Sequence, residues 1–437
     1  MMLNEKFSTG IYTLGCKVNQ YESEAIAEEL ERRGVTLSSP SSVCDAYVIN
    51  TCTVTAESDR KARQFIRRAI NKNPRAYILV TGCLAQTSAD DIAAIDGVDV
   101  IIGNSNKLLV ADELEALIAN GEKNKTPKIL VSDIFKADFE NMTITRFDRT
   151  RAYVKIEDGC ENKCTYCLIP GARGKVRSKD PQKVIEEVEG LVKGGCCEIV
   201  LTGIETASYG KDLGNIDLSD LLCKIAKIPG IRRVRLGSLD PSLIRPDFVK
   251  KIASLKCLAP HFHLSLQSGS DRILALMKRK YNSDMAMRAI TLLRESIPNV
   301  KFTTDVIVGF PGENEEDYLA TERFVREAQF LTVHIFPYSK RKGTPAASMS
   351  GQIPNDIKSD RLHRLEKAAT ESAKTILESA CGKTKSVLFE TFEDGYAYGH
   401  TDDFLEVAVA SEHPLRSEFR DVSILSTDGK ICFGELV

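Results

Sequence analysis

Three cysteines stand close together in the middle of the chain, and their spacing limits what this region can fold around. Cys160, Cys164 and Cys167 lie within eight residues, so one short loop can aim all three sulfurs at a single metal centre. A tetrahedral zinc site would need a fourth ligand nearby, but the next cysteines, Cys196 and Cys197, lie about thirty residues further on. Three thiolates without a fourth favour a 4Fe–4S cluster whose remaining iron is open to a small molecule.

This spacing of three and then two intervening residues resembles that of the radical S-adenosylmethionine (SAM) enzymes. The resemblance implies that the open iron chelates the amino and carboxylate groups of SAM. The alternative interpretation of the same residues is a structural zinc knuckle, or a set of unrelated free thiols. The other motifs of the chain favour the iron–sulfur interpretation.

Composition sets the broad class of protein. At 437 residues the chain is too long for one ordinary core, and two to four domains are expected. The net charge is −2, the first residues lack the pattern of a signal peptide, and no run reaches about eighteen uncharged apolar residues. Thirteen cysteines without an export signal indicate metal ligation or buried thiols rather than disulfides. We therefore expect a cytoplasmic protein without a membrane segment.

The first domain, expected over residues 1–135, contains three similar segments, each a short apolar run that ends in a cysteine. Short apolar runs end at Cys16, Cys52 and Cys83, and charged segments with helical spacing follow the first two. This alternation predicts a parallel sheet covered by helices on both faces. Because parallel strands end at one edge, where such sheets bind ligands, the three cysteines should meet there as a second three-thiolate site. Taken singly, each would be an ordinary buried cysteine, and Cys44, which precedes its strand, is left out.

The helix expected after Cys52 is strongly basic. Six lysines and arginines lie between positions 60 and 72, whereas its acids stand only at the start. Such a face is usually a solvated surface, and a contact with nucleic-acid phosphates is the alternative. The helix also carries an apolar stripe at helical period, formed by Ala62, Phe65, Ile66, Ala69 and Ile70.

The segments TLGCKVNQYESE, NTCTVT and TGCLAQ, followed by DGCENKCTYC, resemble the methylthiotransferase family of radical SAM enzymes. The subgroup that matches best modifies threonylcarbamoyladenosine in tRNA, and the resemblance covers nearly the whole chain. In that family three N-terminal cysteines hold an auxiliary 4Fe–4S cluster, which implies this role for Cys16, Cys52 and Cys83. Two 4Fe–4S clusters and SAM are therefore the expected cofactors.

Beyond an extended linker expected at residues 136–150, the central domain is expected over residues 151–377. It alternates six apolar strands with helical segments. A closed barrel of eight βα units would need two more, so a partial (β/α)6 barrel that stays open fits better. Its ligands should gather at the C-terminal ends of the strands, where the loop of Cys160 also lies.

Small and polar residues mark several of these strand ends. Glycine there permits close approach of the backbone to a ligand. The resemblance implies that these residues bind the methionyl amino group, ribose and adenine of SAM, although ordinary turn glycines and capping residues look similar. His261 and His263 share one side of the fourth strand, where hydrogen-bonded interior histidines are commoner than metal ligands. The expected SAM-binding residues are Gly203, Glu205, Ser265, Gln267, Asp305 and Gly309.

Three short basic runs follow strand ends and are expected to form a rim that grips a polyanion. Taken alone, each run would be a solvated surface. Gly171 is a departure from the family, whose members commonly have an aromatic residue there, so a contact made by that ring is not expected. The runs are Arg173, Lys175, Arg177 and Lys179, then Lys278, Arg279 and Lys280, then Lys340, Arg341 and Lys342.

Residues 378–437 form short alternating runs broken by glycine and aspartate turns, which predicts a small antiparallel β-barrel. Its position and the segment GHTDDFLEVAV resemble the TRAM domain, a tRNA-binding module. Residues 381–437 hold eleven acidic and five basic residues, a poor composition for general phosphate binding. The fold class expected for the whole chain is α/β with this TRAM-like barrel at the end. Contact with tRNA is expected only at a local patch of Lys383, Lys385, Arg416 and Arg420.

These features predict an enzyme, a methylthiotransferase that adds a methylthio group to carbon 2 of N6-threonylcarbamoyladenosine at position 37 of tRNA. The aromatic C–H bond has no acidic proton, so a SAM-derived 5′-deoxyadenosyl radical is needed to open it. The resemblance implies a second SAM as the methyl source and sulfur held at the auxiliary cluster. Expected partners are the tRNA anticodon loop, whose unstacked base can enter a pocket, and a low-potential electron donor such as flavodoxin or ferredoxin. We expect a monomer, and no residue is assigned as a general acid or base.

Other functions stay open. Within the class, the substrate could be isopentenyladenosine in tRNA or an aspartate of a ribosomal protein, although KVNQYESE and NTCTVT favour the threonylcarbamoyl branch. From a different class, the chain could be an iron–sulfur electron-transfer or RNA-binding scaffold, which would not cleave SAM.

Overall fold

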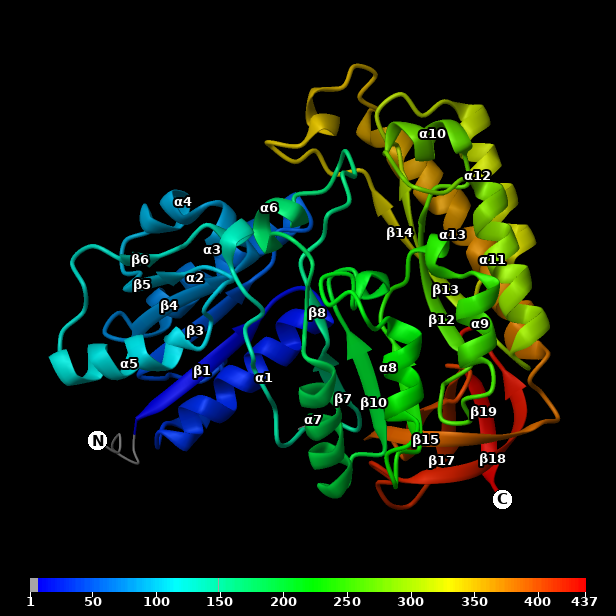
Figure 1. Ribbon diagram of the computed structural model, residues 1–437, viewed down its shortest axis with the longest axis horizontal. Coiled ribbons are helices and arrows are strands. Elements are labelled where there is room, and N and C mark those ends of the chain that lie inside the picture. The colour runs from blue at the N-terminus through cyan, green and yellow to red at the C-terminus, as the bar shows by residue number, and fades with distance from the viewer. Residues whose placement is uncertain (1–6, 148) are drawn as a thin grey trace.

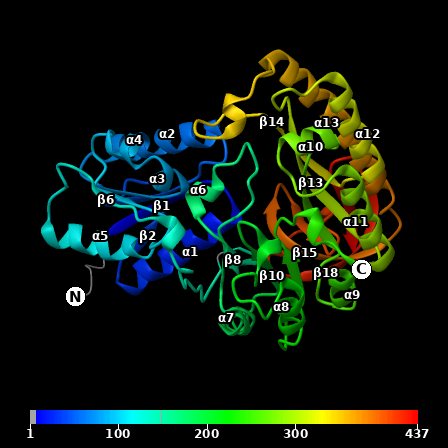
Figure 2. The ribbon, with the colours of Figure 1, turned by 45° about the horizontal axis from the view of Figure 1, so that its top comes forward.

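The computed structural model describes residues 7–147 and 149–437. Figure 1 shows an N-terminal α/β part at the left, a central part built around parallel strands, and a small C-terminal barrel below the central strands. The short helix α6 (Ile169–Arg173) lies between the first two parts (Figure 2) and packs against α3 (Cys83–Thr87).

The N-terminal part is a six-stranded sheet in the order β2–β1–β3–β4–β5–β6, and every neighbouring pair is parallel. Alternate residues of one strand enter different cores, because Val48 packs with α1 and α5 while Ile49 packs with α2. Helices thus cover both faces, as predicted. The strands are β1 (Ser8–Thr13), β2 (Thr36–Ser38), β3 (Ala46–Thr51), β4 (Tyr77–Gly82), β5 (Val100–Ile102) and β6 (Lys128–Leu130), and the helices are α1 (Lys17–Arg32), α2 (Ala56–Lys72), α3, α4 (Ala89–Ala93) and α5 (Leu109–Asn120).

The central strands form the expected open, partial barrel. Two parallel sheets, β11–β10–β7 and β12–β13–β14, are joined by parallel bridges from Val234 to Leu258 and from Leu239 to Leu264. β7 and β14 lie at the two ends of this arrangement, so the barrel does not close within the described residues. The six strands are β7 (Ala152–Lys155), β10 (Glu198–Thr202), β11 (Arg233–Leu236), β12 (His261–Gln267), β13 (Lys301–Val308) and β14 (Thr332–Pro337).

Helices cover the outside of the partial barrel and pack on one large apolar core. Capping boxes begin two of them, at Asp217 for α8 and at Asn314 for α12, and satisfy amide groups of the first turn. The helices are α7 (Pro181–Lys193), α8 (Leu218–Ile225), α9 (Pro246–Ile252), α10 (Asp271–Leu276), α11 (Ser283–Ser296), α12 (Glu315–Ala328) and α13 (Asn355–Glu378). Smaller elements are η1 (Ile134–Lys136), β8 (Glu157–Asp158), β9 (Arg177–Ser178), η2 (Thr206–Ser208), η3 (Pro241–Leu243) and η4 (Pro345–Ser348).

The C-terminal part is a closed five-stranded barrel in the order β15–β16–β17–β19–β18. Four of its pairings are antiparallel, as expected for a TRAM-like barrel, whereas β17 and β19 pair in parallel. In the expected tRNA patch, Lys385 pairs with Asp403 and Arg420 with Glu418, so part of its charge is used within the barrel. The strands are β15 (Thr384–Glu393), β16 (Tyr396–Thr401), β17 (Glu406–Ala410), β18 (Phe419–Thr427) and β19 (Cys432–Leu436).

Two arginines of β11 attach this barrel to the central part. Arg235 donates to the carbonyl oxygens of Thr401 and Asp402 at 2.6 and 2.9 Å. Arg233 donates to the carbonyl oxygen of Ser386 at 3.3 Å. Among the described helices, we find none that is long and apolar enough to cross a membrane.

Candidate functional site

The three N-terminal cysteines come together at one edge of the first sheet. Cys16 immediately precedes α1, Cys52 follows β3, and Cys83 is the first residue of α3 after β4. Gly15 has a φ of +94° and packs so closely that a Cβ on it would lie 2.6 Å from the Cys52 sulfur. Burial, with Cys83 and Cys16 adding to it, raises the pKa of Cys52 to about 12. The parallel topology therefore places all three cysteines at the same edge of the sheet.

The second group of thiols occupies the loop between β8 and α6. Burial, helped by Glu205 and by the other two thiols, raises the pKa of Cys160 to about 12. Burial also raises the pKa of Cys167 to about 11, and Cys83 of the first group contributes to that shift. The helix α6, which follows this loop, packs against α3, which begins at Cys83, so both groups of thiols adjoin the contact between the N-terminal part and the partial barrel.

Arg173 connects the two groups, a role that no local pattern in the sequence indicates. Its side chain is fully buried, and its Nε donates to the sulfur of Cys83 at 3.3 Å. Its Nη2 donates to Oδ1 of Asn19 at 2.6 Å, and Asn19 donates in turn to the carbonyl oxygens of Leu14 and Thr51. One side chain from α6 therefore holds the chain segments before Cys16 and Cys52 as well as the Cys83 sulfur.

A buried ionic network supports Arg173. Glu22 of α1 accepts from Lys155 at 2.7 Å and also pairs with Lys107 and Arg173. Burial works to raise the pKa of Glu22, but these three cations outweigh it and hold the pKa well below its usual range. Asp158 joins the network through Lys155, at 2.7 Å. Removing one member would leave an uncompensated buried charge, which is costly.

Arg279 plays the matching part at the other group of thiols. Its Nη1 donates to the Cys164 sulfur at 3.3 Å, while its Nη2 donates to Asp240 at 2.9 Å and to the carbonyl oxygen of Ser265 at 3.1 Å. The cysteine loop is thereby fixed to the ends of β11 and β12. Thiolates are the ligands of iron–sulfur clusters, and hydrogen bonds to their sulfurs tune such clusters. Both groups of three thiols, each with an arginine donor, fit this chemistry.

The expected basic rim is therefore wrong for its arginines and for Lys179, which is buried and pairs with Glu187. Arg341 is buried as well, and its Nη2 donates to Thr53 and Asp59, both at 2.7 Å, beside Cys52. These side chains turn inward because acids from distant segments neutralise them, while sulfurs and carbonyl oxygens accept their hydrogen bonds. The buried or partly buried members of the three runs are Arg173, Arg177, Lys179, Arg279 and Arg341, and the exposed members are Lys175, Lys278, Lys280, Lys340 and Lys342.

Two of the predicted SAM-binding residues adjoin the cysteine loop. Glu205 accepts a hydrogen bond from Nδ2 of Asn162 at 2.7 Å, and a Cβ on Gly203 would lie 2.6 Å from Oε2 of Glu157. Burial, followed by Asp240, raises the pKa of Glu205 to about 7. Asn162, Glu205 and Asp240 line a cavity of about 340 Å³.

The other four predicted SAM-binding residues do not all lie together. Ser265 of β12 accepts from Arg279 through its carbonyl oxygen, and Gln267, the last residue of that strand, has a φ of +69° at a bulge. Gly309 follows β13 with a φ of +70°. Asp305 lies deeper in β13, where its Oδ2 is 3.2 Å from Nε2 of His263. The expectation that Asp305 lies at a strand end is therefore wrong, because three residues of β13 follow it.

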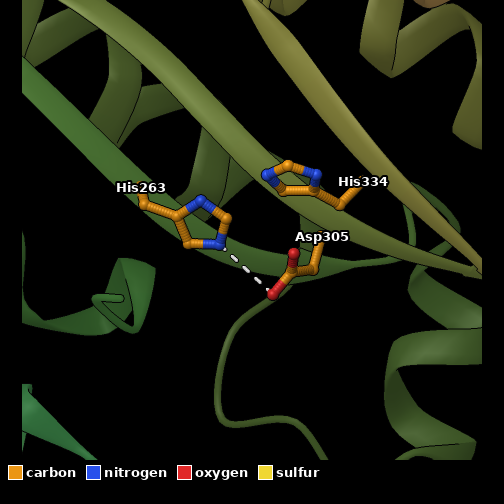
Figure 3. A group of neighbouring side chains, drawn as sticks. All are labelled: His263, Asp305 and His334. Carbon is orange, nitrogen blue, oxygen red and sulfur yellow. Dashed lines mark ion pairs between the residues drawn. The ribbon is translucent and has the colours of Figure 1, made fainter. Parts of the chain in front are cut away.

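Asp305, His263 and His334 form a cluster on three neighbouring strands (Figure 3), and their ligand atoms all lie within 4.8 Å of one another. Both ring nitrogens of His263 already have partners, because Nδ1 lies 2.9 Å from Oγ1 of Thr303. His261 bonds the same hydroxyl at 3.1 Å, which confirms the prediction of hydrogen-bonded interior histidines. We therefore interpret this cluster as a hydrogen-bonding surface rather than a set of metal ligands.

Comparison with known proteins identifies the family. The Radical SAM superfamily matches residues 154–325, and the uncharacterized protein family UPF0004 matches residues 8–103. The chain is 39% identical to the threonylcarbamoyladenosine tRNA methylthiotransferase MtaB of Bacillus subtilis, over 96% of this chain and 94% of that protein. It is 36% identical, over 95% of each chain, to a tRNA-2-methylthio-N(6)-dimethylallyladenosine synthase of Dictyoglomus thermophilum.

Solved structures share the fold at much lower identity. The radical S-adenosylmethionine methyltransferase TsrM of Kitasatospora setae has a TM-score of 0.58 at 15% identity, over 78% of this chain and 77% of that chain. The superfamily match implies SAM and a 4Fe–4S cluster as cofactors. Because a relative at 39% identity spans nearly the whole chain, this protein belongs to the radical SAM methylthiotransferase family and is MtaB-like.

Proposed function

We propose that this enzyme adds a methylthio group to carbon 2 of N6-threonylcarbamoyladenosine 37 in the anticodon loop of tRNA. The observation that carries the proposal is the pair of three-thiol groups on either side of one contact, where Arg173, on the helix after one group, donates to the Cys83 sulfur of the other at 3.3 Å. The names of relatives in Bacillus subtilis and Thermotoga maritima, both 39% identical, point to the same substrate.

We assign the two groups of thiols to two 4Fe–4S clusters. Cys160, Cys164 and Cys167 hold the cluster that binds SAM, and Cys16, Cys52 and Cys83 hold the second. When bound, the clusters and SAM supply the radical, the sulfur and the methyl group for an unactivated C–H bond. The residues of this chain position these groups: Arg279 and Arg173 donate to sulfurs, and Glu205 offers an acceptor beside the cysteine loop.

The exposed lysines of the three basic runs and the basic face of α2 are the surfaces we assign to the tRNA backbone. Arg67 and Arg68 of α2 are exposed, and we find no ion pair for either among the described residues. An anticodon loop suits the site because an unstacked base can leave the loop and enter an enzyme pocket. A low-potential donor such as flavodoxin or ferredoxin supplies electrons, and the enzyme acts as a monomer.

A second candidate substrate is the dimethylallyl (isopentenyl) adenosine of tRNA. A relative named for that substrate is 36% identical over 95% of this chain, so the domain arrangement alone does not separate the two. The difference between the substrates is the group on N6, which is charged in one and apolar in the other.

The test uses anaerobically reconstituted protein beside two triple Cys→Ala variants, one for each group of thiols. We expect about eight irons in the parent and about four in each variant. The variant at Cys160, Cys164 and Cys167 should form no 5′-deoxyadenosine, while the variant at Cys16, Cys52 and Cys83 should cleave SAM without thiolating RNA. The product is identified by mass spectrometry of nucleosides from a stem-loop carrying threonylcarbamoyladenosine. Zinc in place of iron, or no SAM cleavage under strong reductant, would overturn the proposal.

A further inference from the structure

The two faces of β14, the last strand of the partial barrel, differ in what covers them. Val333 and Ile335 pack against the large apolar core that the outer helices share. His334 and Phe336 point to the opposite face, because successive side chains of a strand alternate, and both are exposed. Figure 3 shows His334 on that face, turned toward residues of β12 and β13. Phe336, which is 44% exposed, therefore lies on the inner face of the partial barrel.

Phe336 lies near the C-terminal end of β14, the end at which parallel barrels bind their ligands. In the register of the sheet it lies opposite Ile307 of β13, and the next pair on the same face is Asp305 with His334. Exposed apolar side chains are ordinary when they are scattered over an outer surface. An exposed ring at the ligand-binding end of a barrel strand is instead available to a ligand.

The chain directly after Phe336 reaches the cysteine loop that follows β8. The ring centroid of Phe310 lies 5.5 Å from that of Tyr338 and 6.4 Å from that of Tyr166, which stands within the cysteine loop. The amide of Ala346 also donates to a carbonyl oxygen of that loop, at 2.8 Å. Phe336 is thus two residues away from a segment that packs on the SAM-binding group of thiols.

The same segment reaches the second group of thiols and lies beside α2 (Figure 2). The amide of Ala56, the first residue of α2, donates to Oγ of Ser339 at 3.1 Å. Arg341 donates to Oγ1 of Thr53, the residue that follows Cys52, at 2.7 Å. The segment that leaves β14 therefore contacts the chain beside both groups of thiols.

The exposed side chains of this segment are positively charged. Lys340 and Lys342 are exposed on either side of the buried Arg341, and we find no ion pair for either lysine among residues 7–147 and 149–437. Such cations suit the phosphates of a nucleic acid. An exposed ring suits a base, because unpaired bases stack on aromatic side chains. A ring followed by exposed cations thus matches a nucleotide whose base has left its stack.

We propose that Phe336 stacks against the adenine of the target nucleotide and holds it beside both groups of thiols. This inference rests on the proposed function and adds a residue that binds the base. Sulfur is joined to carbon 2 of that base and a SAM-derived radical opens its C–H bond, so the base has to lie within reach of both groups. SAM also carries an adenine, and the experiment separates the two purines.

The test measures the coupling between ring and base in a double-mutant cycle. Reconstituted parent enzyme and Phe336→Ala are titrated with two RNA stem-loops, one carrying threonylcarbamoyladenosine at position 37 and one abasic there, and fluorescence anisotropy gives the affinities. We expect Phe336→Ala to weaken binding of the modified stem-loop at least about fivefold and binding of the abasic one less than about twofold. Phe336→Tyr keeps a ring and should stay within about twofold of the parent on both. The matched control is Leu319→Ala, which removes an exposed apolar side chain from α12 and should bind both stem-loops like the parent.

Three other results would decide against the proposals. Equal weakening on both stem-loops would overturn the inference, because the ring would then act on the fold or on another part of the RNA. A loss of SAM affinity or of 5′-deoxyadenosine formation without RNA would assign the ring to the adenine of SAM and overturn it as well. Failure of the parent to thiolate the modified stem-loop would overturn the proposed function instead, whatever the cycle gives for Phe336.

Discussion

The Nε of Arg173 lies 3.3 Å from the Cys83 sulfur, although ninety positions separate the two residues along the chain. Arg173 belongs to the helix that follows the other cysteine loop, so its side chain links that helix to the first group of thiols. The two groups of thiols are therefore parts of a single structural unit.

Arg173→Gln should weaken the second cluster because it removes the donor to Cys83 and leaves Glu22 with one fewer cation. We expect iron to fall from about eight toward about four per chain, with SAM cleavage retained. Iron and sulfide analysis beside a 5′-deoxyadenosine assay measures both. The matched control is Lys175→Gln, an exposed neighbour that should keep full iron. An Arg173→Gln protein with both clusters intact would contradict the role given to this residue.

Glu198→Gln should destabilise the whole protein. Glu198 is buried and compensates three arginines, so neutralising it leaves buried positive charge. The expected loss is about 3–5 kcal/mol in the free energy of unfolding, measured by urea denaturation of the cluster-free protein. Glu186→Gln on the exposed face of α7 serves as the control and should change it by less than about 0.5 kcal/mol. If Glu198→Gln lowers the free energy of unfolding no more than the control does, the three arginines do not depend on Glu198 to offset their mutual repulsion.

The affinity for SAM should depend on pH through Glu205. Its pKa is raised to about 7, so the carboxyl is mostly protonated at pH 6 and mostly ionised at pH 8. An ionised carboxylate is the stronger acceptor for the amino group of SAM, so affinity should increase with pH, by up to about tenfold across this range. Equilibrium binding to the reconstituted enzyme measures it. Glu205→Gln should flatten the profile, and a variant that keeps the parent's slope would assign the pH dependence to another group.

Arg67→Gln/Arg68→Gln should weaken tRNA binding without affecting radical chemistry. Both side chains are exposed on α2, and each phosphate that the protein no longer neutralises should reduce the slope of log affinity against log salt by about 1. Filter binding at several salt concentrations gives the slope, and SAM cleavage without RNA gives the control. An unchanged slope would remove α2 from the RNA-binding surface.

The arrangement of strands and thiols was predictable from the sequence because it follows from a repeated local pattern. Apolar runs end in Cys16, Cys52 and Cys83, and helices separate them, which is the pattern of a parallel sheet. Parallel strands end at the same edge of their sheet, so residues at their ends lie on one side. The six strands of the partial barrel were readable for the same reason.

The arginines could not be assigned from local pattern. In sequence, Arg173 and Lys175 look alike, two cations in one short basic run, yet one is buried and the other exposed. What separates them is Glu22, which lies 151 positions earlier and enters the same buried network. Asp305 was misplaced for a related reason, because its partner His263 belongs to another strand. Long-range charge pairing leaves no periodic signal for a sequence to display.

The inward-turned arginines also bear on how this protein is made. Translation runs at roughly 5–20 residues per second, so the roughly 250 residues from Cys83 to Arg341 take about 13–50 s to emerge. Throughout that interval Cys16, Cys52 and Cys83 have left the ribosome without Arg341 to hold the segment beside Cys52. The thiols synthesised first thus belong to the site completed last, and we expect iron and sulfide to be delivered to the finished chain rather than to the nascent one.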